Sequence, residues 1–168
     1  MFLEYDKADF MSEGVTFSRQ LPDEESTLEL GGSWAKSLRA PLVIHLQGDL
    51  GAGKTTFTRG ILRGLGHTGA VKSPTYAIVE SYPLEAFTLH HFDLYRFASP
   101  EEWEDAGLDD LFSPDSVCII EWPQQGGAFT PPADITVSLN HAAQGRACTA
   151  TAHTANGQKS LEAWLNSN

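Results

Sequence analysis

The feature that most constrains this chain is a glycine-rich stretch that follows an apolar run. Residues 48–55 read GDLGAGKT and fit the phosphate-binding pattern G-x-x-x-x-G-K-[ST] at every fixed position. Glycines let successive backbone N–H groups turn towards one anion, and the helix that follows directs the positive end of its dipole at the same anion. The chain is therefore predicted to contain a β-strand, a phosphate-binding loop (P-loop) and an α-helix in this order.

The P-loop also predicts which side chains meet a nucleotide. Lys54 is expected on the β- and γ-phosphates, and Thr55 offers a hydroxyl to the Mg²⁺ that accompanies a nucleoside triphosphate. The alternative is a chance glycine-rich turn, but both flanks fit the motif. Residues 42–46 are rich in β-forming side chains, and apolar residues recur on one helical face after the loop, at Phe57, Ile61 and Leu65. We therefore favour the phosphate-binding interpretation.

Two carboxylates stand where predicted strands end. Residues 117–120 are apolar and lead into Glu121, which is typical of a Walker B strand whose carboxylate reaches the metal beside the P-loop. For Glu121 the alternative is an ordinary strand end, which the upstream P-loop disfavours. Asp93 follows the β-rich residues 87–92, where a carboxylate can hold a metal-bound water or orient an attacking water.

A short proline-containing string, SPTY at residues 73–76, follows the predicted P-loop helix. Pro74 disfavours a helix at the preceding residue and favours an extended approach. In P-loop enzymes the corresponding position commonly faces the γ-phosphate, so Thr75 is a candidate switch threonine that senses the triphosphate and its metal. An ordinary turn threonine is an equally good interpretation, and the choice stays open.

The remaining elements fit one globular domain. A chain of 168 residues with 41% hydrophobic content can bury its own core. We assign residues 1–20 to an N-terminal extension that is partly disordered, with a candidate edge strand at 15–17, and residues 21–168 to one P-loop domain. A capping box at Ser26 predicts a helix before the P-loop, and Trp103 is interpreted as a buried anchor, with a partner contact as the alternative. Further predicted elements are a hairpin of residues 76–82 and 87–92, a short acidic helix near 100–107, strands at 135–139 and 146–152, and a closing helix at 161–165.

The charge balance disfavours one class of function. The chain has 22 acidic and 11 basic residues, a formal net charge of -11. Because neutralising nucleic-acid phosphates requires clustered Lys and Arg, a broad nucleic-acid-binding surface is disfavoured, and any contact with RNA is expected to be indirect. Arg96 and Arg146 are the candidates for phosphate or base contacts in the second half of the chain, and surface ion pairs are their alternative role.

The histidines and cysteines show no metal-site pattern. His90 and His91 must point to opposite faces of a strand, so we expect one packed and one solvated histidine rather than a two-histidine metal site. Cys118 and Cys148 lack metal-ligand spacing and are interpreted as buried hydrophobic residues. Because neither a basic-then-apolar leader nor a bilayer-length apolar run occurs, we expect a soluble, cytoplasmic protein with no membrane partner.

Several classes of P-loop protein are compatible with these observations. A regulatory GTPase needs D-x-x-G and N-K-x-D strings, which this sequence lacks, so ATP is favoured over GTP. The signature of a transport ATPase is also missing. A small-molecule kinase stays open, although the scarcity of arginines after Lys72 weakens it. A nucleotide sensor that docks a partner without hydrolysis stays open as well.

Four strings in a fixed order resemble the TsaE family, the bacterial ATPases of tRNA threonylcarbamoyladenosine synthesis. They are GDLGAGKTT, SPTY, HFDLYR and IIEWP, and the resemblance runs from about Leu21 to Arg146. It implies an α/β P-loop NTPase fold with a mixed central sheet flanked by helices. It also implies a Mg²⁺-dependent ATPase that works with the TsaB and TsaD proteins. In that family ATP turnover supports threonylcarbamoyl transfer to adenosine in tRNA, and the ATPase meets tRNA only indirectly.

The resemblance also implies roles for individual residues. Thr55 and Glu121 would hold Mg²⁺, and Asp93 would be a carboxylate required for turnover, so that Asp93, Thr75 and Glu121 are the catalytic candidates. Phosphate binding would fall to consecutive positions of the loop and first helical turn: Gly51, Ala52, Gly53, Lys54, Thr55 and Thr56.

One position within the IIEWP string and the position directly after it complete the comparison with the family pattern. Trp122 is similar to a family aromatic residue near the nucleotide. Many relatives continue this string as W-P-E, whereas this chain has Gln124. No role of that acid is therefore carried over to this chain.

Overall fold

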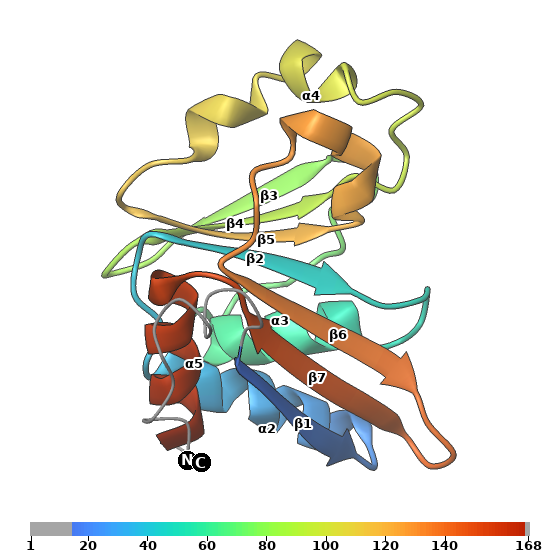
Figure 1. Ribbon diagram of the computed structural model, residues 1–168, viewed down its shortest axis with the longest axis vertical. Coiled ribbons are helices and arrows are strands. Elements are labelled where there is room, and N and C mark those ends of the chain that lie inside the picture. Colours follow the sequence, from blue (N-terminus) through green and yellow to red (C-terminus); the bar gives the residue numbers. More distant parts are fainter. Residues whose placement is uncertain (1–14, 167–168) are drawn as a thin grey trace.

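One twisted sheet organises the protein, and the computed structural model describes residues 15–166 of it (Figure 1). Within that range seven strands are hydrogen-bonded in the order β1-β7-β6-β2-β5-β4-β3. The strands are β1 (Val15–Leu21), β2 (Leu42–Gln47), β3 (Val79–Pro83), β4 (Thr88–Asp93), β5 (Ser116–Glu121), β6 (Ile135–His141) and β7 (Arg146–Ala152). The helices are α2 (Glu24–Ala35), α3 (Lys54–Gly64), α4 (Glu102–Asp105) and α5 (Ala155–Asn166), with 3-10 helices η2 (Leu108–Leu111) and η3 (Pro123–Phe129).

The centre of the sheet is parallel and its edges are antiparallel. β2 pairs in parallel with β5 and β6, and β4 pairs in parallel with β5. β3 at one edge, and β7 with β1 at the other, run antiparallel to their neighbours. The predicted α/β fold with a mixed, helix-flanked sheet is therefore confirmed. The arrowheads of β2, β4 and β5 point to one edge (Figure 1), and that edge carries the candidate site.

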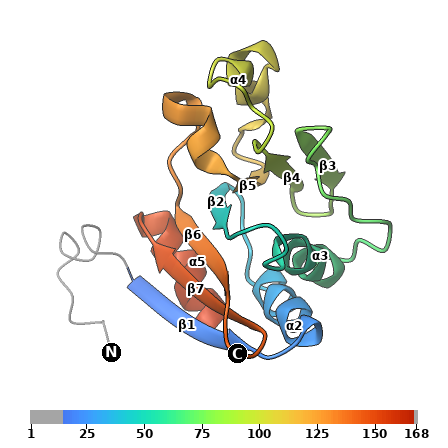
Figure 2. The same ribbon diagram turned by 90° about the vertical axis from the view of Figure 1, so that its right-hand side faces the viewer.

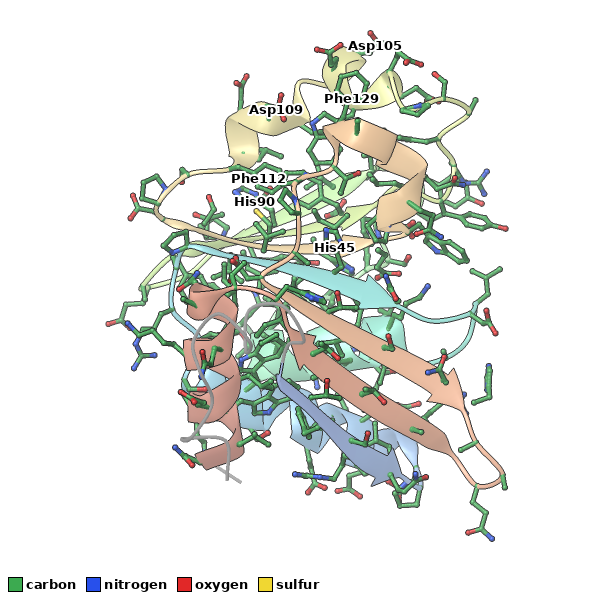
Figure 3. The ribbon with its side chains drawn as sticks, in the orientation of Figure 1. His45, His90, Asp105, Asp109, Phe112 and Phe129 are labelled. Carbon is green, nitrogen blue, oxygen red and sulfur yellow. The ribbon has the colours of Figure 1, made fainter. Side chains whose placement is uncertain are left out.

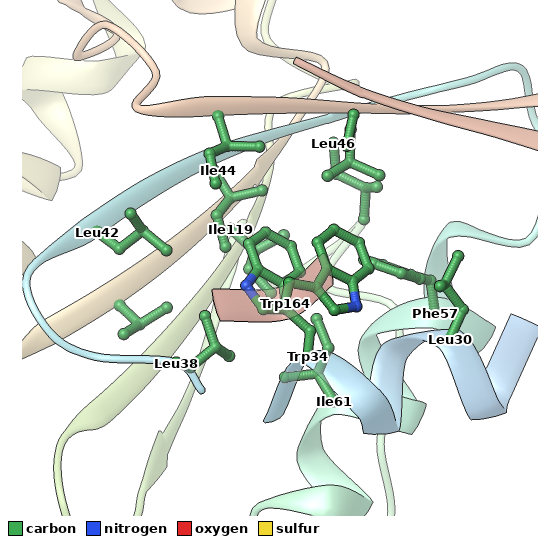
Figure 4. Packing of buried hydrophobic residues seen from close by; sticks show 14 of the residues in the cluster. Leu30, Trp34, Leu38, Leu42, Ile44, Leu46, Phe57, Ile61, Ile119 and Trp164 are labelled. Atoms are coloured by element: carbon green, nitrogen blue, oxygen red, sulfur yellow. The ribbon is translucent and has the colours of Figure 1, made fainter. Parts of the chain in front are cut away.

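Helices cover both faces of the sheet, but unequally (Figure 2). The larger core lies between the sheet and the three longer helices α2, α3 and α5, and the smaller one lies beneath α4, η2 and η3. In the larger core, the indoles of Trp34 and Trp164 stack with centroids 4.1 Å apart, and Phe57 of α3 packs 6.0 Å from Trp164 (Figure 4). Each such aromatic pair adds about 0.5–1.5 kcal/mol beyond its buried area. This packing fixes α3, and with it the P-loop, against the sheet.

Helices α2 and α3 approach each other through glycines. A Cβ on Gly31 would lie 2.4 Å from the carbonyl oxygen of Phe57, and one on Gly60 would lie 2.3 Å from that of Leu28. No larger residue fits at either position without moving a helix. The helix that carries the P-loop is therefore positioned by α2 as well as by the sheet.

Several predicted elements need correction at their ends. α2 begins at Glu24 rather than after Ser26, because Asp23 is the N-cap and its carboxylate accepts the Ser26 N–H at 2.8 Å. The predicted hairpin is present as β3 and β4, and the candidate edge strand at residues 15–17 belongs to β1. α5 begins at Ala155, earlier than the predicted residue 161. Among the described helices, none is long and apolar enough to cross a bilayer.

The structure confirms that Trp103 is a buried anchor of the acidic helix. Trp103 is fully buried in the smaller core, and its indole N–H donates a 2.7 Å hydrogen bond to Asp109. It therefore anchors α4 and is not available as a surface contact. The acidic segment itself is short, because α4 ends at Asp105 and η2 follows after Gly107.

Candidate functional site

A cavity of about 490 Å³ opens where the P-loop meets the carboxyl ends of β4 and β5. In an open sheet of parallel strands this edge is where ligands bind, because the loops diverge there and helix N-termini point into the space. The predicted site residues that line the cavity are Gly51, Gly53, Lys54, Thr55, Thr56, Thr75, Asp93, Glu121 and Trp122. Residues from all four motifs therefore converge on one space.

The P-loop has the backbone that the glycine pattern predicts. Gly51 and Gly53 take φ values of 79° and 103°, a region that side-chain-bearing residues rarely adopt. A Cβ on Gly51 would meet no atom within 4 Å, so this part of the loop borders open space. Gly53 is also the N-cap of α3 and brings no side chain to it. The N–H groups of the first helical turn, which lack partners inside the helix, are therefore available to an anion.

Lys54 lies between the P-loop and the end of β5. Its ammonium donates to the carbonyl oxygen of Gly48 at 2.6 Å and lies 3.7 Å from Oε1 of Glu121. It also sits 4.4 Å from the centroid of the Trp122 ring. The side chain is 6% exposed, so these contacts hold a buried positive charge at the edge of the cavity.

The two predicted carboxylates are neighbours across the sheet. Asp93 and Glu121 are register partners on the parallel strands β4 and β5, and both are buried at the wall of the cavity. Oδ2 of Asp93 accepts a 2.9 Å hydrogen bond from the hydroxyl of Thr75, and Oδ1 accepts one of 2.9 Å from the Tyr95 N–H. The orientation of the Asp93 carboxylate is thus set by groups on two sides.

The segment that carries Thr75 is docked onto the end of β4. The Asp93 N–H donates to the carbonyl of Ile78 at 2.8 Å, and the Ile78 N–H donates to that of Pro74 at 2.7 Å. Ile78 has a φ of 71°, which is rare for a β-branched residue and costs about 1–3 kcal/mol. The surrounding contacts therefore hold this segment in a strained conformation that places Thr75 against Asp93.

Comparisons with known proteins identify the family of the chain. A family model described as "Threonylcarbamoyl adenosine biosynthesis protein TsaE" matches residues 21–148. The chain belongs to the TsaE family. The tRNA threonylcarbamoyladenosine biosynthesis protein TsaE of Haemophilus influenzae is 43% identical over 156 residues, which cover 90% of this chain and 99% of that protein. The Bacillus subtilis protein of the same name is 50% identical over 80 residues, 48% of this chain and 49% of its own length. The crystal structure of Bacillus subtilis YdiB superposes with a TM-score of 0.78 at 28% identity, over 91% of this chain and 96% of that one.

Trp122 turns the chain of this TsaE protein away from the sheet directly after Glu121. Its backbone is left-handed, with a φ of 56°, and it begins the break between β5 and η3. The half-buried indole lies against Lys54 and has its centroid 5.0 Å from the ring of Tyr95. The strained turn therefore places an aromatic ring at the wall of the cavity.

Arg146 has a role that the sequence did not predict. Its guanidinium donates to the carbonyl oxygens of Gly51 at 2.8 Å and Ala52 at 3.0 Å, so that the first residue of β7 holds the tip of the P-loop. Ala52 is fully buried, and its N–H donates to the carbonyl of Asp49 within the loop. Arg96 lies elsewhere, with its guanidinium 4.1 Å from the centroid of the exposed Tyr76 ring.

The cavity is also lined by residues that lie outside the four motifs. They come from the start of α2 and from the turn before β7: Pro22, Asp23, Glu24, Thr27, Gly145 and Arg146. Two sequence signals pointed to this group: the helix start near Ser26, which does not indicate a binding site, and Arg146, which was a candidate for phosphate or base contacts. The start of α2 reaches the cavity because α2 packs closely against α3.

The expectation of one packed and one solvated histidine is wrong. His91 is fully buried and His90 is 8% exposed. His90 is hydrogen-bonded to Ser81 at 2.7 Å and lies on the face covered by α4 and η2 (Figure 3), and burial lowers its pKa. His91 contacts Glu121 with its Nε2 2.6 Å from Oε2. Cys118 and Cys148 are buried as predicted, and burial raises the pKa of each thiol to about 12.

The donor set of this TsaE protein fits a magnesium nucleotide. Among residues 15–166, no three His, Cys, Asp or Glu side chains are grouped as a protein-only metal site. Mg²⁺ in nucleotide sites needs fewer protein ligands, because it keeps several waters and takes one or two protein oxygens in addition to phosphate oxygens. The hydroxyl of Thr55 and the carboxylate of Glu121 line the same cavity and are ligands of this kind.

Proposed function

We propose that this member of a tRNA threonylcarbamoyladenosine biosynthesis family is a Mg²⁺-dependent ATPase that acts with TsaB and TsaD. One observation carries the proposal. The P-loop, Lys54, Glu121 and the Thr75–Asp93 pair line a single cavity, as a phosphate-binding and water-orienting site requires. ATP is favoured as the nucleotide because the sequence lacks the strings that read guanine.

In the proposed reaction the chain binds the triphosphate and orients water. The N–H groups of the P-loop and the ammonium of Lys54 bind the β- and γ-phosphate oxygens. Thr55 and Glu121 would hold Mg²⁺, which when bound supplies positive charge against the phosphate oxygens. Asp93, itself oriented by Thr75, accepts a hydrogen bond from the attacking water. A bond forms between this water oxygen and the γ-phosphorus as the bond to the β–γ bridging oxygen breaks, which gives ADP and phosphate.

The surface near the cavity supports action within a complex. Over residues 15–166, the large hydrophobic side chains most exposed to solvent are Leu50, Tyr76 and Tyr95. Leu50 lines the cavity, while Tyr76 follows Thr75 and the Tyr95 N–H contacts Asp93. Contiguous exposed apolar patches mark interaction sites, and we infer that these three side chains meet a partner protein. The net charge of -11 disfavours direct binding of tRNA, so tRNA is reached through the partners. The proposed location is the cytoplasm.

Phosphate release from Mg-ATP tests this proposal. The purified chain is assayed alone and with TsaB and TsaD, and an Asp93→Asn chain in the same mixtures measures any contaminating ATPase. Slow release that the partners alter, and that the Asp93→Asn chain lacks, is the expected result. If turnover requires a metabolite acceptor and yields a phosphorylated small molecule, the chain is a kinase. If ATP binds and changes the affinity for the partners without release of phosphate, the chain is a nucleotide-dependent docking protein.

A further inference from the structure

The buried histidine of β4 contacts the carboxylate that is proposed to hold the metal. His91 is fully buried, and its Nε2 lies 2.6 Å from Oε2 of Glu121. The other carboxylate oxygen, Oε1, lies 3.7 Å from the ammonium of Lys54. The two oxygens of Glu121 therefore face different groups. Because an ionised carboxylate can only accept, the ring nitrogen of His91 is the donor in this contact.

The second ring nitrogen of His91 shows that packing alone does not account for a histidine at this position. Nδ1 of His91 is buried and has no hydrogen-bond partner in the described part of the chain. A buried polar nitrogen without a partner lowers stability, and an apolar side chain of similar volume would avoid this cost. The neighbouring His90, on the opposite face of β4, has its ring nitrogen hydrogen-bonded to Ser81. Within the described residues, the imidazole ring of His91 therefore has Glu121 as its hydrogen-bond partner.

We propose that His91 is a positioning residue, which orients the Glu121 carboxylate for the metal. Its N–H holds Oε2 at the back of the site and leaves Oε1 at the wall of the cavity, beside Lys54. A carboxylate with one oxygen fixed loses less conformational freedom when the other oxygen binds a cation. The inference rests on the proposed function, because it concerns the metal that accompanies the nucleotide.

The test is metal binding rather than turnover. With saturating ATPγS, Mn²⁺ replaces Mg²⁺, and its dissociation constant is read from the electron paramagnetic resonance signal of free Mn²⁺. ATPγS binding without metal is measured in parallel. His91→Leu removes the donor at similar volume, and His91→Gln keeps an amide N–H near the position of Nε2. His90→Leu is the matched control, because it removes the neighbouring imidazole, which faces the other side of the sheet.

The leucine variant at position 91 is expected to bind Mn²⁺ about 10–100-fold more weakly, the usual effect of losing a group that orients a metal ligand. The glutamine variant should retain most of the affinity, and metal-free ATPγS binding should be unchanged in all variants. Should His91→Leu fail to fold, His91→Asn replaces it, because its shorter amide aligns with Nδ1 and does not reach Glu121.

Three results would overturn the inference alone: wild-type Mn²⁺ affinity in His91→Leu, equal losses in the leucine and glutamine variants, or an equal loss in His90→Leu. A wild-type chain that does not bind ATPγS at all would overturn the proposed function, and the inference with it. The two failures are therefore distinguished by the wild-type protein.

Discussion

The hydroxyl of Thr75 donates a 2.9 Å hydrogen bond to the carboxylate of Asp93, so the segment after the P-loop helix is tied to the end of β4. The sequence left open whether Thr75 senses a nucleotide or belongs to an ordinary turn. The contact places it against a buried carboxylate at the wall of the cavity. A role in turnover is therefore the more specific interpretation, and it can be tested separately from binding.

Replacing Thr75 by valine removes the hydroxyl while nearly preserving the shape of the side chain. We expect the rate of ATP hydrolysis to fall by about tenfold, the effect of one lost hydrogen bond of about 1.4 kcal/mol, because the Asp93 carboxylate is then less well oriented. Affinity for Mg-ATP should change little. Single-turnover phosphate release and equilibrium binding provide the two measurements. Thr75→Ser, which keeps the hydroxyl, should restore the rate, and a serine variant as slow as the valine variant would argue against this mechanism.

Replacing Lys54 should mainly change the affinity for ATP, whereas replacing Glu121 should mainly change the rate of turnover. Lys54→Ala removes the positive charge next to the P-loop, and ATP affinity should fall by about a hundredfold or more, as expected for hydrogen bonds to a charged group. Glu121→Ala should mainly reduce metal-dependent turnover. Titration calorimetry measures the ATP affinity of each variant, and phosphate release with and without Mg²⁺ measures its metal-dependent turnover. The control is Lys36→Ala at the exposed end of α2. Equally tight ATP binding by the wild type and Lys54→Ala would refute the phosphate-binding assignment.

Arg146 should stabilise the P-loop from outside the motif. Arg146→Lys keeps the charge but cannot reproduce the two hydrogen bonds to Gly51 and Ala52. The free energy of unfolding should fall by about 1–2 kcal/mol, and ATP affinity should fall several-fold because the loop is held less firmly. Urea unfolding and nucleotide titration measure both. Arg39→Lys is the matched control, since the guanidinium of Arg39 donates to the adjacent Leu38 carbonyl. If Arg39→Lys lost as much stability and ATP affinity as Arg146→Lys, the effect would come from replacing any arginine and not from the contacts of Arg146 with the P-loop.

Burial of His90 predicts a pH-dependent stability. Because burial lowers its pKa, the folded state binds a proton less readily than the unfolded state. The stabilisation is fully present above the ordinary histidine pKa of 6.5 and is lost as the pH falls towards the lowered value. Each such group contributes a slope of up to about 1.4 kcal/mol per pH unit. Urea unfolding between pH 5 and 8 should show that the free energy of unfolding depends less steeply on pH in His90→Leu than in the wild type. Identical slopes in the two proteins would exclude His90 as a source of the pH dependence.

The sequence by itself determined the local parts of the site. The P-loop could be predicted because glycine spacing sets a backbone conformation within a few residues, and the largely apolar residues 42–46 indicate the strand before it. Asp93 and Glu121 could be predicted as site residues because a charge directly after a buried strand must lie at the edge of a sheet. The assignment of residues 51–56 to phosphate binding rests on this local pattern together with the family resemblance, and it stays a prediction.

Only the tertiary structure decided which of these parts meet. The strand order β2-β5-β4 makes Asp93 and Glu121 register partners, and β7 brings Arg146 to a loop that lies far from it in the sequence. The burial of both histidines, the contact of His91 with Glu121 and the approach of α2 to the cavity also depend on this order. Local sequence patterns report the backbone preferences and burial of neighbouring residues. Contacts between distant elements arise from how strands pair and helices pack, which no short stretch of this chain encodes alone.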